Sequence, residues 1–188
     1  ARSLRQSLAK MEDVSTYTDM SFQREDLYFS EDFFPLLRYR LLTTSPENLK
    51  NIHLMEEGIE HLFIKQIKQA TSMQDFINRC TSKRYSGARI TRSICHLLTG
   101  TSKDEAASFL KQKPPYIRIL GADTIGRQYL AKIRKQVTTP IISRFPAATF
   151  SLLQLELQAT YTYFATRPIL QQIQEAKKER TIFPINVK

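Results

Sequence analysis

The sequence predicts a mainly α protein: one compact helical domain with at most two short extended segments. Apolar residues recur at three- and four-residue spacing along most of the 188 residues, as amphipathic helices require. Only five glycines are present, fewer than turn-rich β architectures use. A chain of this length can bury a core without disulfides, and Cys80 and Cys95 lack the spacing of a metal framework.

Six helices are expected between residues 31 and 112. Ser30 is a suitable N-cap for the first of them, and Gly100 is a natural stop for the fifth. The S-x-x-E sequence that begins at Ser102 is a capping box, which opens the last helix of this part. The expected ranges are 31–42, a short helix from 46, 57–70, 72–81, 88–99 and 103–112.

The rest of the chain combines two short extended segments with three helices. Residues 116–120 are rich in β-formers and lie between Pro115 and Gly121. Residues 140–143 form the second extended segment. The expected helices are 124–135, 150–165 and 169–180.

The spacing of Gly121 and Gly126 resembles a nucleotide phosphate loop. However, Arg127 and Gln128 stand where that motif has Lys and a hydroxyl residue for the magnesium ion. We therefore expect an ordinary turn with Gly121 at positive φ and with Asp123 or Thr124 capping the next helix. In an alternative interpretation, the helix start and Arg127 hold a nucleic-acid phosphate.

Positive charge is concentrated in the middle third of the chain. The net charge is +10, and residues 79–144 contain 14 Lys and Arg against three Asp and Glu. Residues 1–78 are net negative. A solvated surface of mixed signs would be more even, so this distribution indicates a region that binds a polyanion.

The strongest candidate site is the acid-free segment from Arg79 to Arg92. On a helix that begins near residue 88, one polar stripe would contain Arg89, Arg92, Ser93 and His96. The preceding residues add positive charge and a tyrosine ring that could stack on a base. The candidate RNA-binding residues are Lys83, Arg84, Tyr85, Arg89, Arg92, His96, Arg118 and Arg127.

No catalytic or metal-binding constellation is recognisable. The three histidines have no i, i+4 spacing and no acidic cluster beside them, and paired acids lie at helix starts, where the macrodipole favours them. Neither a membrane span nor a signal peptide is visible, so we expect a cytoplasmic protein with no membrane contact.

Several blocks together resemble the C-terminal part of the tRNA(Met) cytidine acetate ligases, a bacterial nucleotidyl-transferase-like family. They occur in the family's order between about residues 27 and 144. The blocks are Glu31-Asp32-Phe33, Leu37-Arg38-Tyr39-Arg40, Glu57-Gly58-Ile59-Glu60, Ser82-Lys83-Arg84-Tyr85, Pro115-Tyr116-Ile117-Arg118, Gly126-Arg127 and Pro140-Ile141-Ile142.

The resemblance implies an enzyme that uses ATP to activate acetate as acetyl-adenylate and then forms N4-acetylcytidine at the wobble position of elongator tRNA(Met). The family's adenylylation motif would lie in an N-terminal nucleotidyl-transferase-like domain of the same protein. Residues 1–20 would be the tail of that nucleotide-binding domain or a linker, with Arg5 as an ATP contact. Residues 21–188 would be a helical tRNA-binding domain that needs no cofactor and has no catalytic residue of its own.

Two other classes of protein remain open. The helices 88–99 and 103–112 on either side of Gly100 could form a helix-turn-helix that binds DNA, although the basic stripe lies on the first helix and not on the second. A helical scaffold for protein interactions is the other alternative.

Overall fold

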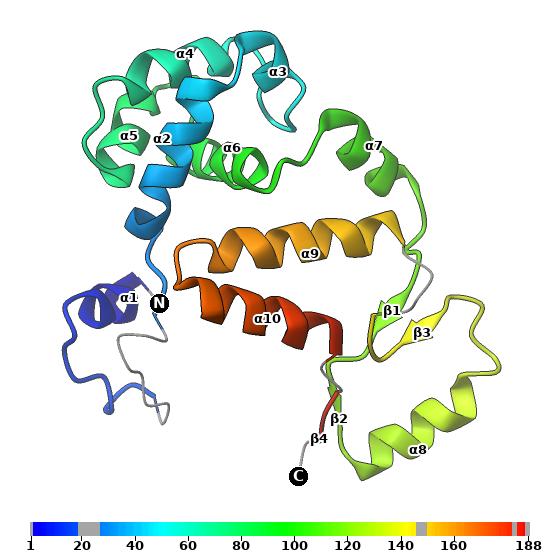
Figure 1. Cartoon of the computed structure of the whole chain (residues 1–188). Helices are drawn as coiled ribbons and strands as arrows, with labels where there is room; N and C mark the ends of the chain where they lie inside the picture. Colours follow the sequence, from blue (N-terminus) through cyan, green and yellow to red (C-terminus); the bar gives the residue numbers. More distant parts are fainter. Residues whose placement is uncertain (1, 19–26, 146–149, 182–183, 187–188) are drawn as a thin grey trace.

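The computed structural model describes residues 2–18, 27–145, 150–181 and 184–186. Helices make up most of it, and short strands lie in its second half (Figure 1). The helices are α1 (Arg2–Ala9), the 3-10 helix η2 (Ser30–Phe33), α2 (Phe34–Thr43), α3 (Pro46–Lys50), α4 (Ile59–Ile67), α5 (Met73–Cys80), α6 (Gly87–Thr99), α7 (Lys103–Lys111), α8 (Thr124–Ile133), α9 (Ser151–Phe164) and α10 (Ile169–Thr181). The strands are β1 (Ile117–Arg118), β2 (Gly121–Ala122), β3 (Ile141–Ile142) and β4 (Ile185–Asn186).

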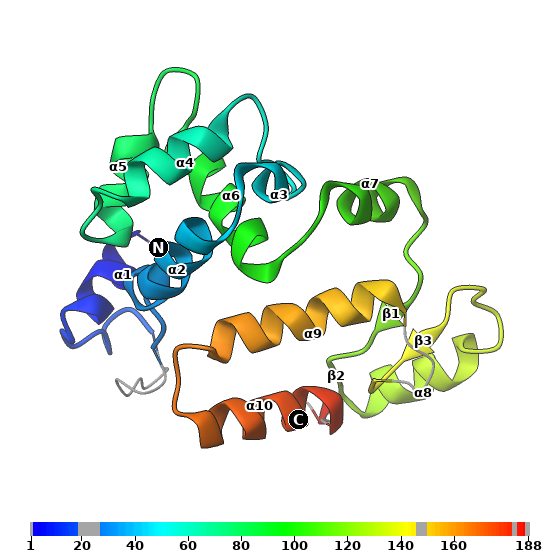
Figure 2. The same cartoon turned by 45° about the horizontal axis from the view of Figure 1, so that its top comes forward.

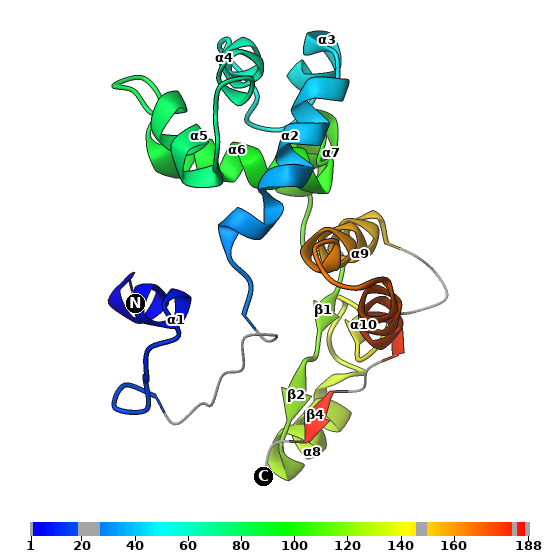
Figure 3. The ribbon, with the colours of Figure 1, turned by 60° about the vertical axis from the view of Figure 1, so that its left-hand side comes forward.

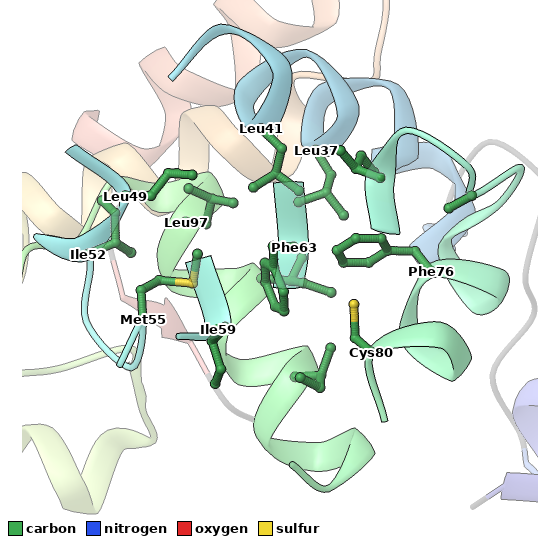
Figure 4. Packing of buried hydrophobic residues seen from close by; sticks show 14 of the residues in the cluster. Leu37, Leu41, Leu49, Ile52, Met55, Ile59, Phe63, Phe76, Cys80 and Leu97 are labelled. Carbon is green, nitrogen blue, oxygen red and sulfur yellow. The ribbon is translucent and has the colours of Figure 1, made fainter. Parts of the chain in front are cut away.

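The main core lies among helices α2 to α6 (Figure 4). Phe63 of α4 and Phe76 of α5 meet edge to face at its centre, with ring centroids 5.1 Å apart. Each such side chain stabilises the fold by about 1.5–3 kcal/mol through burial. Other fully buried members are Leu37, Leu41, Leu49, Met55, Ile59, Ile67, Cys80, Ile90 and Leu97.

Serine caps set where several of these helices begin. The hydroxyls of Ser45, Ser72, Ser86 and Ser102 each accept a hydrogen bond from the backbone N–H three residues further on. Gly100 ends α6 in the left-handed region, at φ 73°. The capping box and the glycine stop predicted from the sequence are thus confirmed, and each cap is worth about 1 kcal/mol.

Helices α9 and α10 form an antiparallel hairpin below this cluster (Figures 1 and 2). Helix α9 packs on α6 and buries Leu153 and Leu157. Helix α10 packs on α9 but buries no residue completely. Viewed from the side, β1 runs beside this hairpin, and β2, β4 and α8 lie beyond it, away from the helical cluster (Figure 3).

The strands form two parallel pairs between segments far apart in the sequence. In the β1–β3 pair Ile117 is opposite Ile141, and in the β2–β4 pair Gly121 is opposite Ile185. The prediction of a mainly α, compact helical domain with at most two extended segments is therefore wrong. Strands β2 and β4 are only two residues long, so their pairing with distant partners creates them and no local periodicity reveals them.

Helix α7 does not form a helix-turn-helix with α6. It lies beyond the C-terminal end of α6 and does not pack across it (Figures 1 and 2). Its start is tied to the end of α3 instead, because Lys103 donates its backbone N–H to Asn51 and His53 donates to Thr101. The DNA-binding alternative loses its structural basis.

Within the described ranges, no helix is both long and apolar enough to cross a membrane.

Candidate nucleic-acid interface

A basic surface forms where the loop after α5 enters α6. Ser86 caps α6 by accepting from the N–H of Arg89, which fixes the direction of the first turn. Just before it, the backbone N–H of Ser82 donates to the carbonyl of Tyr85 and closes a tight turn. This geometry collects one patch, called here the α6 basic surface, which consists of Lys83, Arg84, Arg89 and Arg92.

Glu57 holds two of these arginines in place. Its Oε2 lies 3.2 Å from Nη1 of Arg89 and 3.7 Å from Nη2 of Arg84. The Arg84 side chain remains 63% exposed and that of Arg89 27% exposed. Ion pairs this exposed contribute about 0–1 kcal/mol, so Glu57 orients the guanidiniums without binding them strongly.

The ring of Tyr85 packs against the same two arginines, Arg84 and Arg89. Its ring is only 7% exposed, its hydroxyl donates to the backbone carbonyl of Glu57, and both guanidinium carbons lie 5.3 Å from its ring centroid. A ring in this position cannot stack on a base, so the predicted role of Tyr85 is corrected. It is a positioning residue for Arg84 and Arg89 through cation–π contact.

Lys83 and Arg92 complete the α6 basic surface. Both side chains are exposed, and neither makes an ion pair with any residue that the structure describes. Their charge is therefore available to an incoming anion.

The predicted polar stripe ends at Arg92. Ser93 is fully buried and its hydroxyl donates to the carbonyls of Leu54 and Arg89, 3.1 Å away in each case. His96 is half-buried, with its ring edge-on to His53 at 4.7 Å between centroids. Desolvation, with a smaller contribution from His53, lowers the pKa of His96, so the sequence-predicted phosphate contact does not suit it.

Arg118 pairs with two carboxylates inside the fold, and its contact with RNA stays a prediction. Its guanidinium lies 2.6 Å from Glu156 of α9 and 2.6 Å from Glu179 of α10, and its side chain is 18% exposed. Desolvation opposes its charge, but the hydrogen bonds to the two carboxylates outweigh this and raise the pKa of Arg118. The hydroxyl of Tyr116 donates to the same Glu156 carboxylate.

Arg127 lies on a second basic element, helix α8. Asp123 caps this helix by accepting from the N–H of Gly126 at 2.6 Å, as predicted. Gly121 lies in β2 and not at positive φ, so that part of the turn prediction is wrong. Arg127 borders a cavity of about 420 Å³ together with Arg134, a residue that the sequence reasoning missed. Their i, i+7 spacing on one helix was the signal that could have revealed it.

Arg5 lies in α1, but its side chain is outside the described residues, so its predicted contact with ATP stays a prediction. Among the described residues, no group of His, Cys, Asp and Glu is arranged to hold a metal ion.

The chain thus combines a helical cluster, two parallel strand pairs and two separate basic surfaces. The sequence profile of one protein family matches it. That profile, described as HIGH Nucleotidyl Transferase, matches residues 1–179. The chain therefore belongs to the HIGH nucleotidyl transferase family.

The similar proteins found within that family share one name, tRNA(Met) cytidine acetate ligase. A tRNA(Met) cytidine acetate ligase of Halalkalibacterium halodurans is 38% identical over 202 residues, which cover 100% of this chain and 49% of the relative. One of Oceanobacillus iheyensis is 40% identical over 149 residues, or 79% of this chain and 37% of the relative. The chain thus spans about half or less of the length of these relatives.

Solved structures show the same fold. The apo form of Thermotoga maritima TmcAL matches with a TM-score of 0.81 and 20% identity, over 98% of this chain and 50% of that one. The same protein bound with alpha-thio ATP matches with a TM-score of 0.73 and 24% identity, over 84% and 42%.

These matches complete the correction of the fold class. Because the family match covers residues 1–179, the prediction that the chain is a helical C-terminal part outside the nucleotidyl transferase match is wrong. The expectation that the chain alone has no nucleotide to bind is withdrawn for the same reason.

Proposed function

We propose that this chain is part of a tRNA(Met) cytidine acetate ligase and that its α6 basic surface contacts the tRNA. The observation that carries the proposal is that Glu57 and Tyr85 hold Arg84 and Arg89 side by side at the start of α6, next to the exposed Lys83 and Arg92. The names of the relatives support the choice of tRNA as the polyanion. Arginine suits this role because its planar fork can hold two phosphate oxygens at once.

Glu57 and Tyr85 prepare this surface for a phosphate. The carboxylate and the ring restrain Arg84 and Arg89 before any ligand arrives, so less side-chain entropy is lost on binding. A phosphate that approaches the two arginines competes with Glu57, whose exposed ion pairs are weak enough to yield. Lys83 and Arg92 can meet neighbouring phosphates without such competition.

The chemistry of the complete enzyme follows from the same proposal. Acetate attacks the α-phosphate of ATP and releases pyrophosphate, which gives acetyl-adenylate. The N4 amine of the wobble cytidine of elongator tRNA(Met) then takes the acetyl group and releases AMP, so that the product carries N4-acetylcytidine. Within this chain we assign an ATP contact to Arg5. The turn at residues 121–126 does not fit a phosphate cradle, because the Asp123 carboxylate already accepts from the N–H of Gly126.

The organisation and location of the protein are part of the proposal. We keep residues 1–20 as a segment distinct from residues 21–188. A tRNA substrate implies that the protein works in the cytoplasm.

The test compares two charge reversals of equal size. Lys83→Glu with Arg92→Glu changes the two α6 basic surface residues that have no ion pair in the described structure. Lys65→Glu with Lys68→Glu makes the same change in net charge at the opposite end of α4 from Glu57, where both lysines are exposed and outside any described ion pair. Binding of elongator tRNA(Met) is measured by fluorescence anisotropy, and folding by circular dichroism.

The α6 pair should weaken tRNA binding by about a hundredfold or more, since each reversal removes a phosphate contact and adds a repelling charge. The α4 pair should have a much smaller effect. Equal losses for both pairs would show that only bulk charge matters and would overturn the proposed interface.

A further inference from the structure

We infer that the cavity beside α8 binds one unstacked nucleotide of the RNA, with the base between apolar walls and the adjoining phosphates on Arg127 and Arg134. This inference rests on the proposed function, because it identifies a second place where the same RNA is held. Helix α8, which lines this cavity, lies on the other side of the α9–α10 hairpin from α6 (Figure 3).

The walls of the α8 cavity come from three parts of the chain. Ile119 and Ile141 belong to the β1–β3 region, Leu130 to α8, and Ile185 to β4. The cavity measures about 420 Å³ and is partly open to solvent. Clefts of about 300–1,000 Å³ with mostly apolar linings and a few polar groups are typical small-ligand sites, and a nucleotide is within this range.

The two arginines supply the polar groups at its edge. Arg127 and Arg134 are seven residues apart, so they project from one face of α8 about 10 Å apart along its axis. Both are exposed, and neither has a hydrogen bond or ion pair from its side chain to any described residue. Two long guanidinium side chains on the rim can therefore reach the phosphates on both sides of a nucleotide in the α8 cavity.

The surrounding charge favours an anion. Residues 124–155 contain five Lys and Arg and no Asp or Glu. The nearest preceding acid, Asp123, is engaged in capping α8. A basic rim over an apolar interior suits a nucleotide, because it has an anionic backbone and a flat base that single-stranded RNA can turn out of the stack.

The experiment uses the full chain and distinguishes the effect of filling the cavity from the effects of removing charge and of unfolding the protein. Arg127→Gln with Arg134→Gln removes both phosphate ligands, whereas Ala131→Trp fills the α8 cavity without changing charge, since Ala131 is an exposed lining residue. Lys132→Gln with Lys135→Gln is the matched control, because it removes the same charge near the same helix but outside the lining. CMP, AMP, inorganic phosphate and elongator tRNA(Met) are titrated in turn, and each variant is melted to check its fold.

Both the arginine pair and Ala131→Trp should abolish binding of CMP and AMP and weaken tRNA binding by about tenfold or more. The arginine pair should also make the dependence of log K on log salt shallower by about 1.4–1.8. The lysine pair should leave mononucleotide binding intact.

Three outcomes would overturn the inference: an equal effect of the lysine pair, no effect of the filled cavity in a folded protein, or inorganic phosphate binding as tightly as CMP and AMP. A different result would contradict the proposed function. If the wild-type chain binds CMP and AMP but not tRNA, the proposed function is wrong and the nucleotide site remains. If it binds tRNA through the α6 basic surface while the α8 variants change nothing, only the α8 inference is wrong.

Discussion

Arg118 of β1 and Glu156 of α9 form an ion pair in which the guanidinium Nη1 lies 2.6 Å from the carboxylate Oε2. Glu179 of α10 accepts from the other arm of the same guanidinium. One half-buried arginine thereby ties a strand to both helices of the α9–α10 hairpin.

We expect Arg118→Met to lower the free energy of unfolding by about 2–4 kcal/mol, because two carboxylates would lose their shared cation. Urea denaturation of the variant and the wild type measures this. At temperatures where the variant is folded, its affinity for tRNA should be unchanged. A stable variant with weak tRNA binding would identify Arg118 as an RNA contact.

Tyr85→Phe should cost about 1 kcal/mol of stability and leave tRNA affinity unaltered. The change removes the hydrogen bond to the carbonyl of Glu57 but keeps the ring beneath Arg84 and Arg89. Thermal melts and tRNA titrations check both parts. A loss of affinity without a loss of stability would contradict the positioning role.

Binding of tRNA should depend strongly on salt. With roughly 4–6 phosphates neutralised, log K is expected to fall against log salt with a slope of about −3 to −5. Titrations at several salt concentrations give the slope. A slope near zero would favour the protein-scaffold alternative, whose contacts do not release counterions.

The free energy of unfolding should depend on pH in part through the protonation of His96. Its pKa is lowered in the folded state by desolvation and by His53, so the folded protein binds its proton less readily than the unfolded chain does. Stability from this group is complete above the ordinary pKa of 6.5 and is lost as the pH falls below it. Denaturation at pH 7.5 and at pH 5.5 should show this decline, and His96→Gln should reduce it.

The two thiols should differ in reactivity. Burial raises the pKa of Cys80 to about 12, whereas Cys95 is exposed on α6. A maleimide at neutral pH should label Cys95 in the folded protein and reach Cys80 only after denaturation. Mass spectrometry of the labelled peptides distinguishes them, and rapid labelling of Cys80 would show that the core opens easily.

Helix positions were largely predictable because local residues determine them. Ser86, Ser102 and Gly100 act through hydrogen bonds and dihedral angles within a few residues, and α6 and α7 begin and end close to the predicted bounds. The pairing of β2 with β4 was not predictable, because neither two-residue strand has a local pattern and each exists through its partner.

The sequence predicted the positive charge of the site residues but not which of them are buried. Lys83, Arg84 and Arg92 lie exposed, as an acid-free segment suggests. Tyr85 and Ser93 are buried by contacts with Glu57 and Leu54, which come from an earlier part of the chain. Such contacts leave no trace in the spacing of residues along one helix.

The parallel strand pairs also have a consequence for the order of folding. Helices α2 to α6 follow one another in sequence and share one core, so their contacts form with small loop-closure entropy. The β2–β4 pair instead closes a loop that contains α8, α9 and α10. Contacts of this range slow folding, so refolding is expected to proceed in two steps, with the helical cluster first and the α8 cavity assembled only when β4 arrives.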